Sequence, residues 1–121
     1  MKKILTIEDD KDINSLICEY LSLQGYETLS ALNGLDAVRT VREQDNLSLL
    51  ILDLMLPFQS GDMVLKKIRE FSDIPVIVVS AKSETHSKID LIRMGADDYI
   101  TKPFDLDELP VRVEVALRRY N

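Results

Sequence analysis

The sequence predicts an α/β fold: a doubly wound, five-stranded parallel sheet of spatial strand order 2-1-3-4-5 with five helices. Short aliphatic stretches alternate with amphipathic stretches of helical period along the whole chain. The connections between them are short, which favours parallel strands, right-handed crossovers and helices on both faces of the sheet. No repeat or internal linker interrupts the alternation, so residues 1–121 are expected to form one domain.

Two strands and two helices are expected in the first part of the chain. Strands are predicted at residues 2–7 and 26–30, the second at a sheet edge because of its polar content. The helix between them ends at Gly25, a usual helix stop. Its apolar stripe has helical spacing and consists of Ile13, Leu16, Ile17, Tyr20 and Leu21. After an Asn33–Gly34 turn, a second helix runs to about Glu43. It is marked by Leu35, Val38 and Val41.

Residues 49–53 are the stretch around which the rest of the chain is organised. Four consecutive aliphatic residues predict a fully buried strand, and Asp53 ends it. An unpaired buried carboxylate is costly, so Asp53 must lie at the mouth of the strand or beside a cation. Pro57 cannot donate to a sheet ladder, so the strand does not continue through it. Asp53 therefore lies where open α/β sheets bind ligands, although a strand-end aspartate can also serve only to cap the following turn.

The second half of the chain supplies the remaining elements. Gly61 opens a third helix, and residues 74–79, the most hydrophobic stretch, predict a central strand. A fourth helix is expected from about residue 85 to 94, followed by a short strand over residues 97–100. The apolar residues of these two helices are Met63, Val64, Ile68, Phe71, Ile89 and Ile92.

The final helix contains the one misfit in the pattern. Asp105 and Glu108 have the spacing of a capping box, with Asp in place of the usual Ser or Thr. Pro110 follows shortly after, and its missing N–H forfeits one intrahelical bond unless the helix starts late. The buried stripe is expected to consist of Leu109, Val113, Ala116 and Tyr120.

Charge and composition exclude several classes of protein. A net charge of −6 argues against a non-specific nucleic-acid binder, because phosphate contacts need clustered Lys and Arg. The apolar runs are too short to cross a bilayer, and no signal-peptide pattern precedes Ile4. A lone cysteine, Cys18, excludes an internal disulfide and fits a reducing compartment, so we expect a cytoplasmic protein. Cys18 itself is expected to be a small, partly buried helix residue.

Polar side chains follow the central strands of the predicted sheet. They are Glu8, Asp9 and Asp10 after the first strand, Asp53 at the end of the third, Ser80 after the fourth and Lys102 after the fifth. Parallel strands end at one edge, so these side chains are expected to converge. Clustered carboxylates raise one another's pKa values unless a cation lies among them, and Mg²⁺ suits oxygen ligands that leave room for several waters.

This set of groups suits a transferring phosphoryl group. Its oxygens need positive charge and hydrogen-bond donors on several sides while Asp53 attacks in line. Each residue also has a simpler interpretation. Glu8 and Asp9 can cap the following helix, and Lys102 can be a solvated surface residue. The coincidence of all these groups at one edge favours the phosphoryl site.

Four motifs carry a family resemblance: ILTIEDD at residues 4–10, LDLMLP at 52–57, VSA at 79–81 and GADDYITKPF at 95–104. Together they resemble the receiver domains of two-component response regulators, and the resemblance covers the whole chain. It implies a CheY-like (flavodoxin-like) fold and phosphorylation of Asp53 by a sensor histidine kinase. It also implies that Mg²⁺ is bound by Asp9, Asp53 and the backbone carbonyl of Met55, with Glu8 completing the acidic pair through water.

The resemblance also implies a switch. Lys102 would pair with the acyl phosphate, and the Lys102–Pro103 peptide bond would be cis. Ser80 would move to bond a phosphoryl oxygen while Tyr99 turns inward behind it. The protein is then a signalling receiver that promotes its own phosphotransfer and dephosphorylation, and it is not expected to be an enzyme in the usual sense.

The end of the chain resembles the OmpR/PhoB subfamily, which dimerises through its fourth helix, fifth strand and fifth helix. The residues implied in this face are Lys88, Ile89, Ile92, Asp97, Asp98, Glu108, Pro110, Arg112 and Arg119. The alternative is an ordinary solvated face, since exposed ion pairs contribute only ~0–1 kcal/mol each. Such regulators usually continue into a winged-helix DNA-binding domain, so we expect an excised receiver whose contact with DNA requires that missing domain.

Two departures from the family pattern stand out, and there are two rival classes of function: an enzyme, either nucleotide-using or phosphatase-like, and an interaction module that is not phosphorylated. Phe58 and Ser60 lie where the family often has Gly and Asp, and the only histidine, His86, is expected to be solvated. A nucleotide-binding enzyme is disfavoured because no G-x-G-x-x-G follows the first strand. A phosphatase is disfavoured because Met55 leaves no second acid two residues after Asp53. A receiver-like module that is not phosphorylated is disfavoured because the full set of site residues is present.

Overall fold

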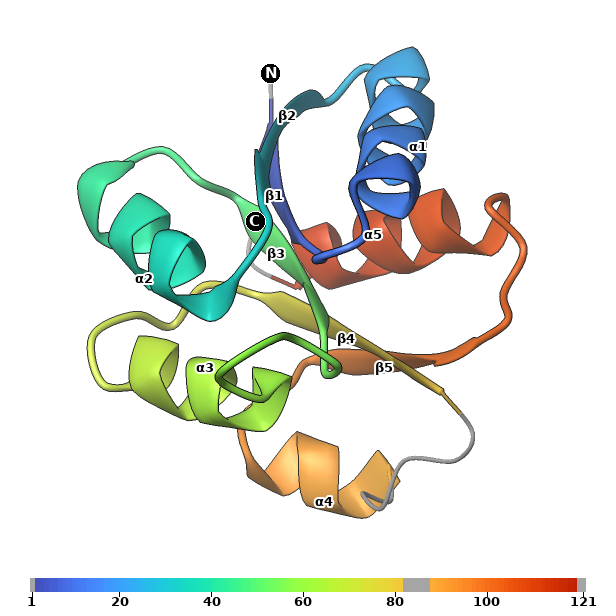
Figure 1. Cartoon of the computed structure of the whole chain (residues 1–121). Coiled ribbons are helices and arrows are strands. Elements are labelled where there is room, and N and C mark those ends of the chain that lie inside the picture. The colour runs from blue at the N-terminus through green and yellow to red at the C-terminus, as the bar shows by residue number, and fades with distance from the viewer. Residues whose placement is uncertain (1, 82–87, 120–121) are drawn as a thin grey trace.

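Five parallel strands form one sheet in the order β2-β1-β3-β4-β5 (Figure 1). The computed structural model describes residues 2–81 and 88–119. The strands are β1 (Lys3–Ile7), β2 (Glu27–Ala31), β3 (Leu49–Asp53), β4 (Val76–Ala81) and β5 (Asp98–Lys102). The helices are α1 (Lys11–Leu23), α2 (Gly34–Glu43), α3 (Gly61–Arg69), α4 (Lys88–Arg93) and α5 (Glu108–Arg118). The predicted fold class and strand order are confirmed. The expectations for His86, Tyr120 and the first turn of the fourth helix fall outside the described residues.

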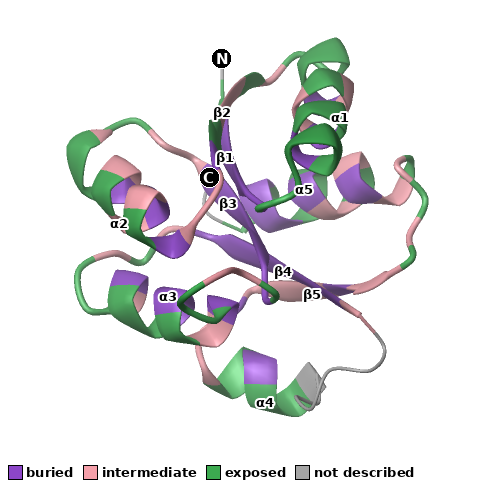
Figure 2. Cartoon of the chain, viewed as in Figure 1, coloured by how far each residue is buried: buried purple, intermediate pink, exposed green. Residues whose placement is uncertain are grey.

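The sheet separates two apolar cores, because successive side chains of a strand point to opposite faces. Leu50 and Leu52 of β3 face the core under α2, α3 and α4, whereas Leu49 and Ile51 face the core under α1 and α5 (Figure 1). All five residues of β3 are buried, as Figure 2 shows for the centre of the sheet. Burial on both faces explains why this strand is a continuous aliphatic run that ends in Asp53.

The predicted apolar stripe of α1 is only partly buried. Ile17 and Leu21 are 4% and 0% exposed, but Ile13 and Leu16 are 38% and 50% exposed. Asn14, which the stripe did not include, is 2% exposed. Helical spacing defines a wide apolar face, and the sheet covers only the part that includes Asn14, Ile17 and Leu21. Five other predicted apolar helix residues are likewise exposed: Leu35, Met63, Phe71, Ile89 and Ile92.

The start of α5 differs from the predicted capping box. The helix begins at Glu108, and its N-cap is Asp107, whose side chain makes no capping bond and instead accepts the Tyr20 hydroxyl. Asp105 contributes only its backbone carbonyl, which accepts the Glu108 N–H at 3.0 Å. The predicted Asp105–Glu108 box was therefore wrong. Pro110 is the third helical residue, where an N–H has no intrahelical acceptor, so the proline forfeits no hydrogen bond. Within the described ranges, none of the helices has the length and apolarity needed to cross a membrane.

Candidate functional site

The acidic and basic residues predicted at the carboxyl edge of the sheet do converge. Asp53 ends β3 and Glu8 follows β1, and each is 3% exposed. Lys102 ends β5, and its side chain reaches past β4 to both carboxylates. Its Nζ lies 2.6 Å from Asp53 Oδ2 and 3.1 Å from Glu8 Oε1. Lys102 is therefore the cationic partner that a buried Asp53 requires, and it is not simply a solvated surface residue.

The turn after β1 presents Glu8 and Asp9 to this site because Asp10 caps the next helix. Asp10 Oδ1 accepts the N–H groups of Asp12 and Ile13 at 3.0 and 3.2 Å. The Asp10 N–H in turn donates to Glu8 Oε2 at 3.2 Å. The alternative in which Glu8 and Asp9 cap α1 is therefore wrong.

The site carries an excess of negative charge. One carboxylate oxygen from each of Glu8, Asp9 and Asp53 lies within 4.8 Å of the others. Burial, together with the hydrogen bond and charge of Asp53, raises the pKa of Glu8 to about 7. Burial alone would lower the pKa of Lys102, but the hydrogen bonds and charges of Asp53 and Glu8 raise it overall. Three carboxylates facing one ammonium, all offering oxygen ligands, fit a hard divalent cation.

The loop after β3 holds the carboxylate of Asp53 in place. Asp53 Oδ1 accepts the Met55 N–H at 2.8 Å, and the Gly61 N–H donates to the Leu54 carbonyl at 2.9 Å. A Cβ atom at Gly61 would lie 2.5 Å from the Asp53 carbonyl oxygen and 2.5 Å from the Leu54 Cα. The sequence identified Gly61 only as a helix start, whereas the structure shows that the end of β3 requires a glycine there.

We predict that Gly61→Ala destabilises the fold by about 1–3 kcal/mol, because the backbone at Asp53 must shift to admit the methyl group. Urea denaturation measures the change in the free energy of unfolding. Ser60→Ala is the matched control, since Ser60 is exposed and makes no side-chain capping bond. An unchanged midpoint in Gly61→Ala would show that the loop is not packed as tightly as described.

A buried hydroxyl lies beside the carboxylate cluster. Val79 of β4 pairs with Asp53 of β3, and Ser80 is the next residue along β4. Ser80 is fully buried, and its Oγ has no hydrogen-bond partner within the described part of the chain. Leaving a buried hydroxyl unpaired costs roughly 1–3 kcal/mol. A hydrogen bond from Ser80 to a ligand at this edge would therefore be favourable. Tyr99 of β5 is partly buried and packs against the core under α4.

The match to a family model decides what kind of site this is. Residues 4–114 match the family described as the response regulator receiver domain. The chain belongs to that family. This receiver is 34% identical to the receiver domain of Francisella response regulator 1452, with a TM-score of 0.91 and complete coverage of both chains. It is 30% identical to a two-component response regulator from Clostridium difficile, with a TM-score of 0.92 over 100% of this chain and 99% of the other.

Curated relatives of this receiver are longer. It is 44% identical over 118 residues to the uncharacterized transcriptional regulatory protein YrkP of Bacillus subtilis, covering 98% of this chain and 50% of the relative. It is 37% identical over 119 residues to the transcriptional regulatory protein CpxR of Klebsiella pneumoniae, covering 98% and 50%. The chain thus spans about half the length of the curated relatives that it matches.

The expected cis peptide bond and one departure from the family pattern are both visible in the receiver. The Lys102–Pro103 peptide bond is cis, as expected. Phe58 has φ +66°, and its side chain is fully exposed. A positive φ favours glycine, which explains why the family often has glycine there. Ser60, the second departure, is the N-cap of α3.

Several residues expected in the dimer face contact other residues of the same chain. Arg112 Nη1 lies 3.1 Å from Asp98 Oδ1, and Arg112 Nη2 lies 3.3 Å from Glu108 Oε1. The Asp97 carboxylate is 14% exposed and pairs with Arg69 of α3 at 3.2 Å. Arg119 Nη1 reaches the Asp97 carbonyl at 3.4 Å. Ile89 and Ile92 of α4 are 64% and 45% exposed. The side chain of Lys88 lies outside what the structure describes.

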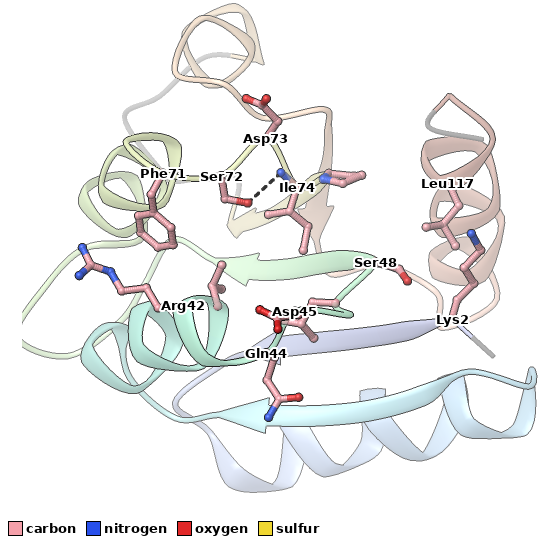
Figure 3. A pocket seen from close by; sticks show the side chains of 13 residues that line it. Lys2, Arg42, Gln44, Asp45, Ser48, Phe71, Ser72, Asp73, Ile74 and Leu117 are labelled. Atoms are coloured by element: carbon pink, nitrogen blue, oxygen red, sulfur yellow. Dashed lines mark hydrogen bonds between the residues drawn. The ribbon is translucent and has the colours of Figure 1, made fainter.

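Of the hollows in the described part of the chain, two bear on the site, and neither is lined by the carboxylate cluster. One of about 850 Å³ lies at the opposite, amino edge (Figure 3). The charged residues that line it have both signs: Lys2, Arg42, Asp45 and Asp73. The Arg42 guanidinium stacks over the Phe71 ring at 4.7 Å. A second hollow, of about 500 Å³, adjoins Lys102 and is lined by Ile13, Leu16, Phe104 and other apolar residues.

Proposed function

We propose that this receiver is a phosphorylation-activated switch in which Asp53 accepts a phosphoryl group from a sensor histidine kinase. The observation that carries the proposal is the buried Asp53 carboxylate, 2.6 Å from Lys102 and close to two further carboxylates. An Asp53 oxygen forms the new P–O bond while the P–N bond to the donor's histidine breaks. The electron pair of that bond stays on the imidazole nitrogen.

Mg²⁺ is the proposed metal of this site. Asp9, Asp53 and the Met55 carbonyl would bind it directly, and Glu8 through water. When bound, Mg²⁺ neutralises charge on the transferring phosphoryl oxygens. The oxygen-only donor set supports a hard cation, and Lys102 adds a second positive charge at the Asp53 oxygen.

The switch is proposed to run from Asp53 through Ser80 and Tyr99. The Ser80 hydroxyl donates to a phosphoryl oxygen, which gives this buried group the partner that it lacks within the described chain. Movement of Ser80 toward Asp53 leaves space behind it into which the Tyr99 ring turns. The change in the position of Tyr99 alters the face formed by α4, β5 and α5, where two protomers associate.

The donor and the output complete the proposal. Ile13 and Leu16 are apolar, exposed and next to Lys102, so we place the kinase's histidine-bearing domain against this hollow. Relatives named transcriptional regulators support control of transcription through an attached winged-helix domain. The net charge of −6 argues against non-specific DNA binding by the receiver itself.

Phosphoryl labelling tests this function directly. Incubation with acetyl phosphate and Mg²⁺ is expected to add one phosphoryl group per chain, because Asp53 is the single proposed acceptor. Intact-mass spectrometry measures the gain. Chelation of Mg²⁺ by EDTA is expected to suppress it. Equal labelling with and without the chelator would contradict the proposed role of the metal.

Phosphorylation is expected to tighten self-association, measured by sedimentation before and after labelling. Arg112→Ala is expected to weaken the phosphorylated dimer, because Arg112 organises Asp98 and Glu108 on the proposed face. Arg118→Ala is the matched control and is expected to leave self-association unchanged. Arg118 is an exposed arginine on the same helix, and among the described residues it pairs only with Glu114. Sedimentation that does not respond to phosphorylation would count against this face.

A further inference from the structure

Asn14 is a buried polar side chain that holds the turn leading to the acidic site. It lies on α1 and is 2% exposed. Its Nδ2 lies 3.2 Å from the Thr6 carbonyl oxygen, 3.0 Å from the Glu8 carbonyl oxygen and 3.2 Å from the Ala31 carbonyl oxygen. One amide group therefore joins the carboxyl ends of β1 and β2 to α1.

The contacts fix both ends of the Asn14 amide. Only the amide nitrogen can donate to these carbonyls, and because it carries two hydrogens, one hydrogen is shared between two of the three acceptors. Asn14 Oδ1 accepts the Cys18 thiol at 3.4 Å. The Ala31 carbonyl also accepts the Glu8 N–H at 3.1 Å. Glu8 is thus held at its N–H through Ala31 and at its carbonyl through Asn14. Asp9, the next residue, is joined to this restrained peptide unit.

Packing alone does not explain an asparagine at this position. Asn14, Ile17 and Leu21 follow each other at i, i+3 and i+7 on the face of α1 that contacts the sheet, where apolar residues stabilise most. A leucine there would have the same number of side-chain heavy atoms and would itself bring no polar atom into the interior, but it could not donate to the three carbonyls. The amide therefore satisfies strand-end carbonyls. Two of the three, those of Thr6 and Glu8, belong to the segment that carries the Glu8 and Asp9 side chains.

We propose that Asn14 is a positioning residue for the metal site: it fixes the backbone of Glu8, and through it the Glu8 and Asp9 carboxylates, in the arrangement that binds Mg²⁺ beside Asp53. This inference rests on the proposed function, because it assumes that the three carboxylates bind Mg²⁺. Loss of such a supporting hydrogen bond commonly weakens metal affinity roughly 10–100-fold.

The test compares Mg²⁺ affinity in Asn14→Leu and in the natural sequence by isothermal titration. The dissociation constant is expected to rise about tenfold or more in Asn14→Leu, while urea unfolding in EDTA remains cooperative. Ser15→Ala, an exposed change one residue along α1, is expected to leave affinity unchanged. A folded Asn14→Leu that binds Mg²⁺ as tightly as the natural sequence would overturn the inference.

A measurement without a substitution covers the case in which Asn14→Leu does not fold. In an NMR titration of the natural sequence with Mg²⁺, the Asn14 side-chain amide signals are expected to shift together with the backbone signal of Asp9. Amide signals of Asn14 that stay fixed while Asp9 shifts would overturn the inference. If the natural sequence binds no Mg²⁺ at all, the proposed function fails and the inference fails with it. If Mg²⁺ binds and shifts Asp9 but not Asn14, only the inference fails, so the two failures are distinguishable.

Discussion

Asp53→Asn is expected to remove all detectable phosphoryl labelling by acetyl phosphate. The amide is nearly the same size as the carboxylate, so the buried position is filled, but it has no anionic oxygen to attack phosphorus. The variant is expected to fold, because it removes one negative charge from a cluster of three carboxylates. The measurement is the intact mass after incubation, alongside the free energy of unfolding in EDTA.

Two further variants make the Asp53→Asn result specific. Asp9→Asn keeps the proposed acceptor and is expected to label more slowly and to need more Mg²⁺. Glu19→Gln removes one exposed carboxylate from α1 and is expected to label normally. Full labelling of Asp53→Asn would show that a residue other than Asp53 accepts the phosphoryl group.

Lys102→Met is expected to slow labelling of Asp53 by a factor of roughly 10²–10³, the usual cost of removing one group that stabilises developing negative charge. The Nζ of Lys102 contacts both Asp53 and Glu8, and methionine keeps most of the side-chain length without the charge. Lys102 is 30% exposed, so water would partly compensate in the unphosphorylated protein. The rate of labelling under saturating Mg²⁺ is therefore the informative quantity.

Lys67→Met is the matched control for Lys102. Lys67 lies on α3, is 49% exposed and pairs with Glu70, far along the helix from the carboxyl edge. Its replacement is expected to leave the labelling rate unchanged. Equal rates in Lys102→Met and Lys67→Met would mean that the ammonium of Lys102 takes no part in the transfer.

The residues at the ends of strands could be predicted from the sequence because the rule that governs them is local. An aliphatic run that ends in Asp53 indicates a buried strand with a charge at its mouth, and parallel strands bring their ends together. The same rule predicts that Lys102 lies at this edge, because Lys102 ends β5. The chemistry of the clustered groups indicated a phosphoryl site, and the family resemblance supplied the role of each residue; these roles remain proposals.

Other features depend on which surfaces meet in space, and the sequence did not reveal them. The helical spacing of α1 put Ile13 and Leu16 in one apolar stripe with Ile17, but both are exposed, whereas Asn14 is buried and its amide contacts three strand-end carbonyls. The spacing of Asn14 from Ile17 and Leu21, at i, i+3 and i+7, was the sequence feature that could have indicated its burial. Gly61 similarly read as a helix start, because nothing in the sequence indicates that its Cα lies against the backbone of Asp53.

The carboxylate of Asp53, held between Lys102 and the acidic pair, is the proposed acceptor of the phosphoryl group. The most direct test is to label the natural sequence with acetyl phosphate and Mg²⁺, reduce the acyl phosphate with borohydride and locate the reduced residue by peptide mass spectrometry. Reduction converts a phosphorylated aspartate to homoserine. We expect homoserine at position 53 and at no other aspartate. An unreduced Asp53 in labelled protein, with homoserine at Asp9 or elsewhere, would contradict the account.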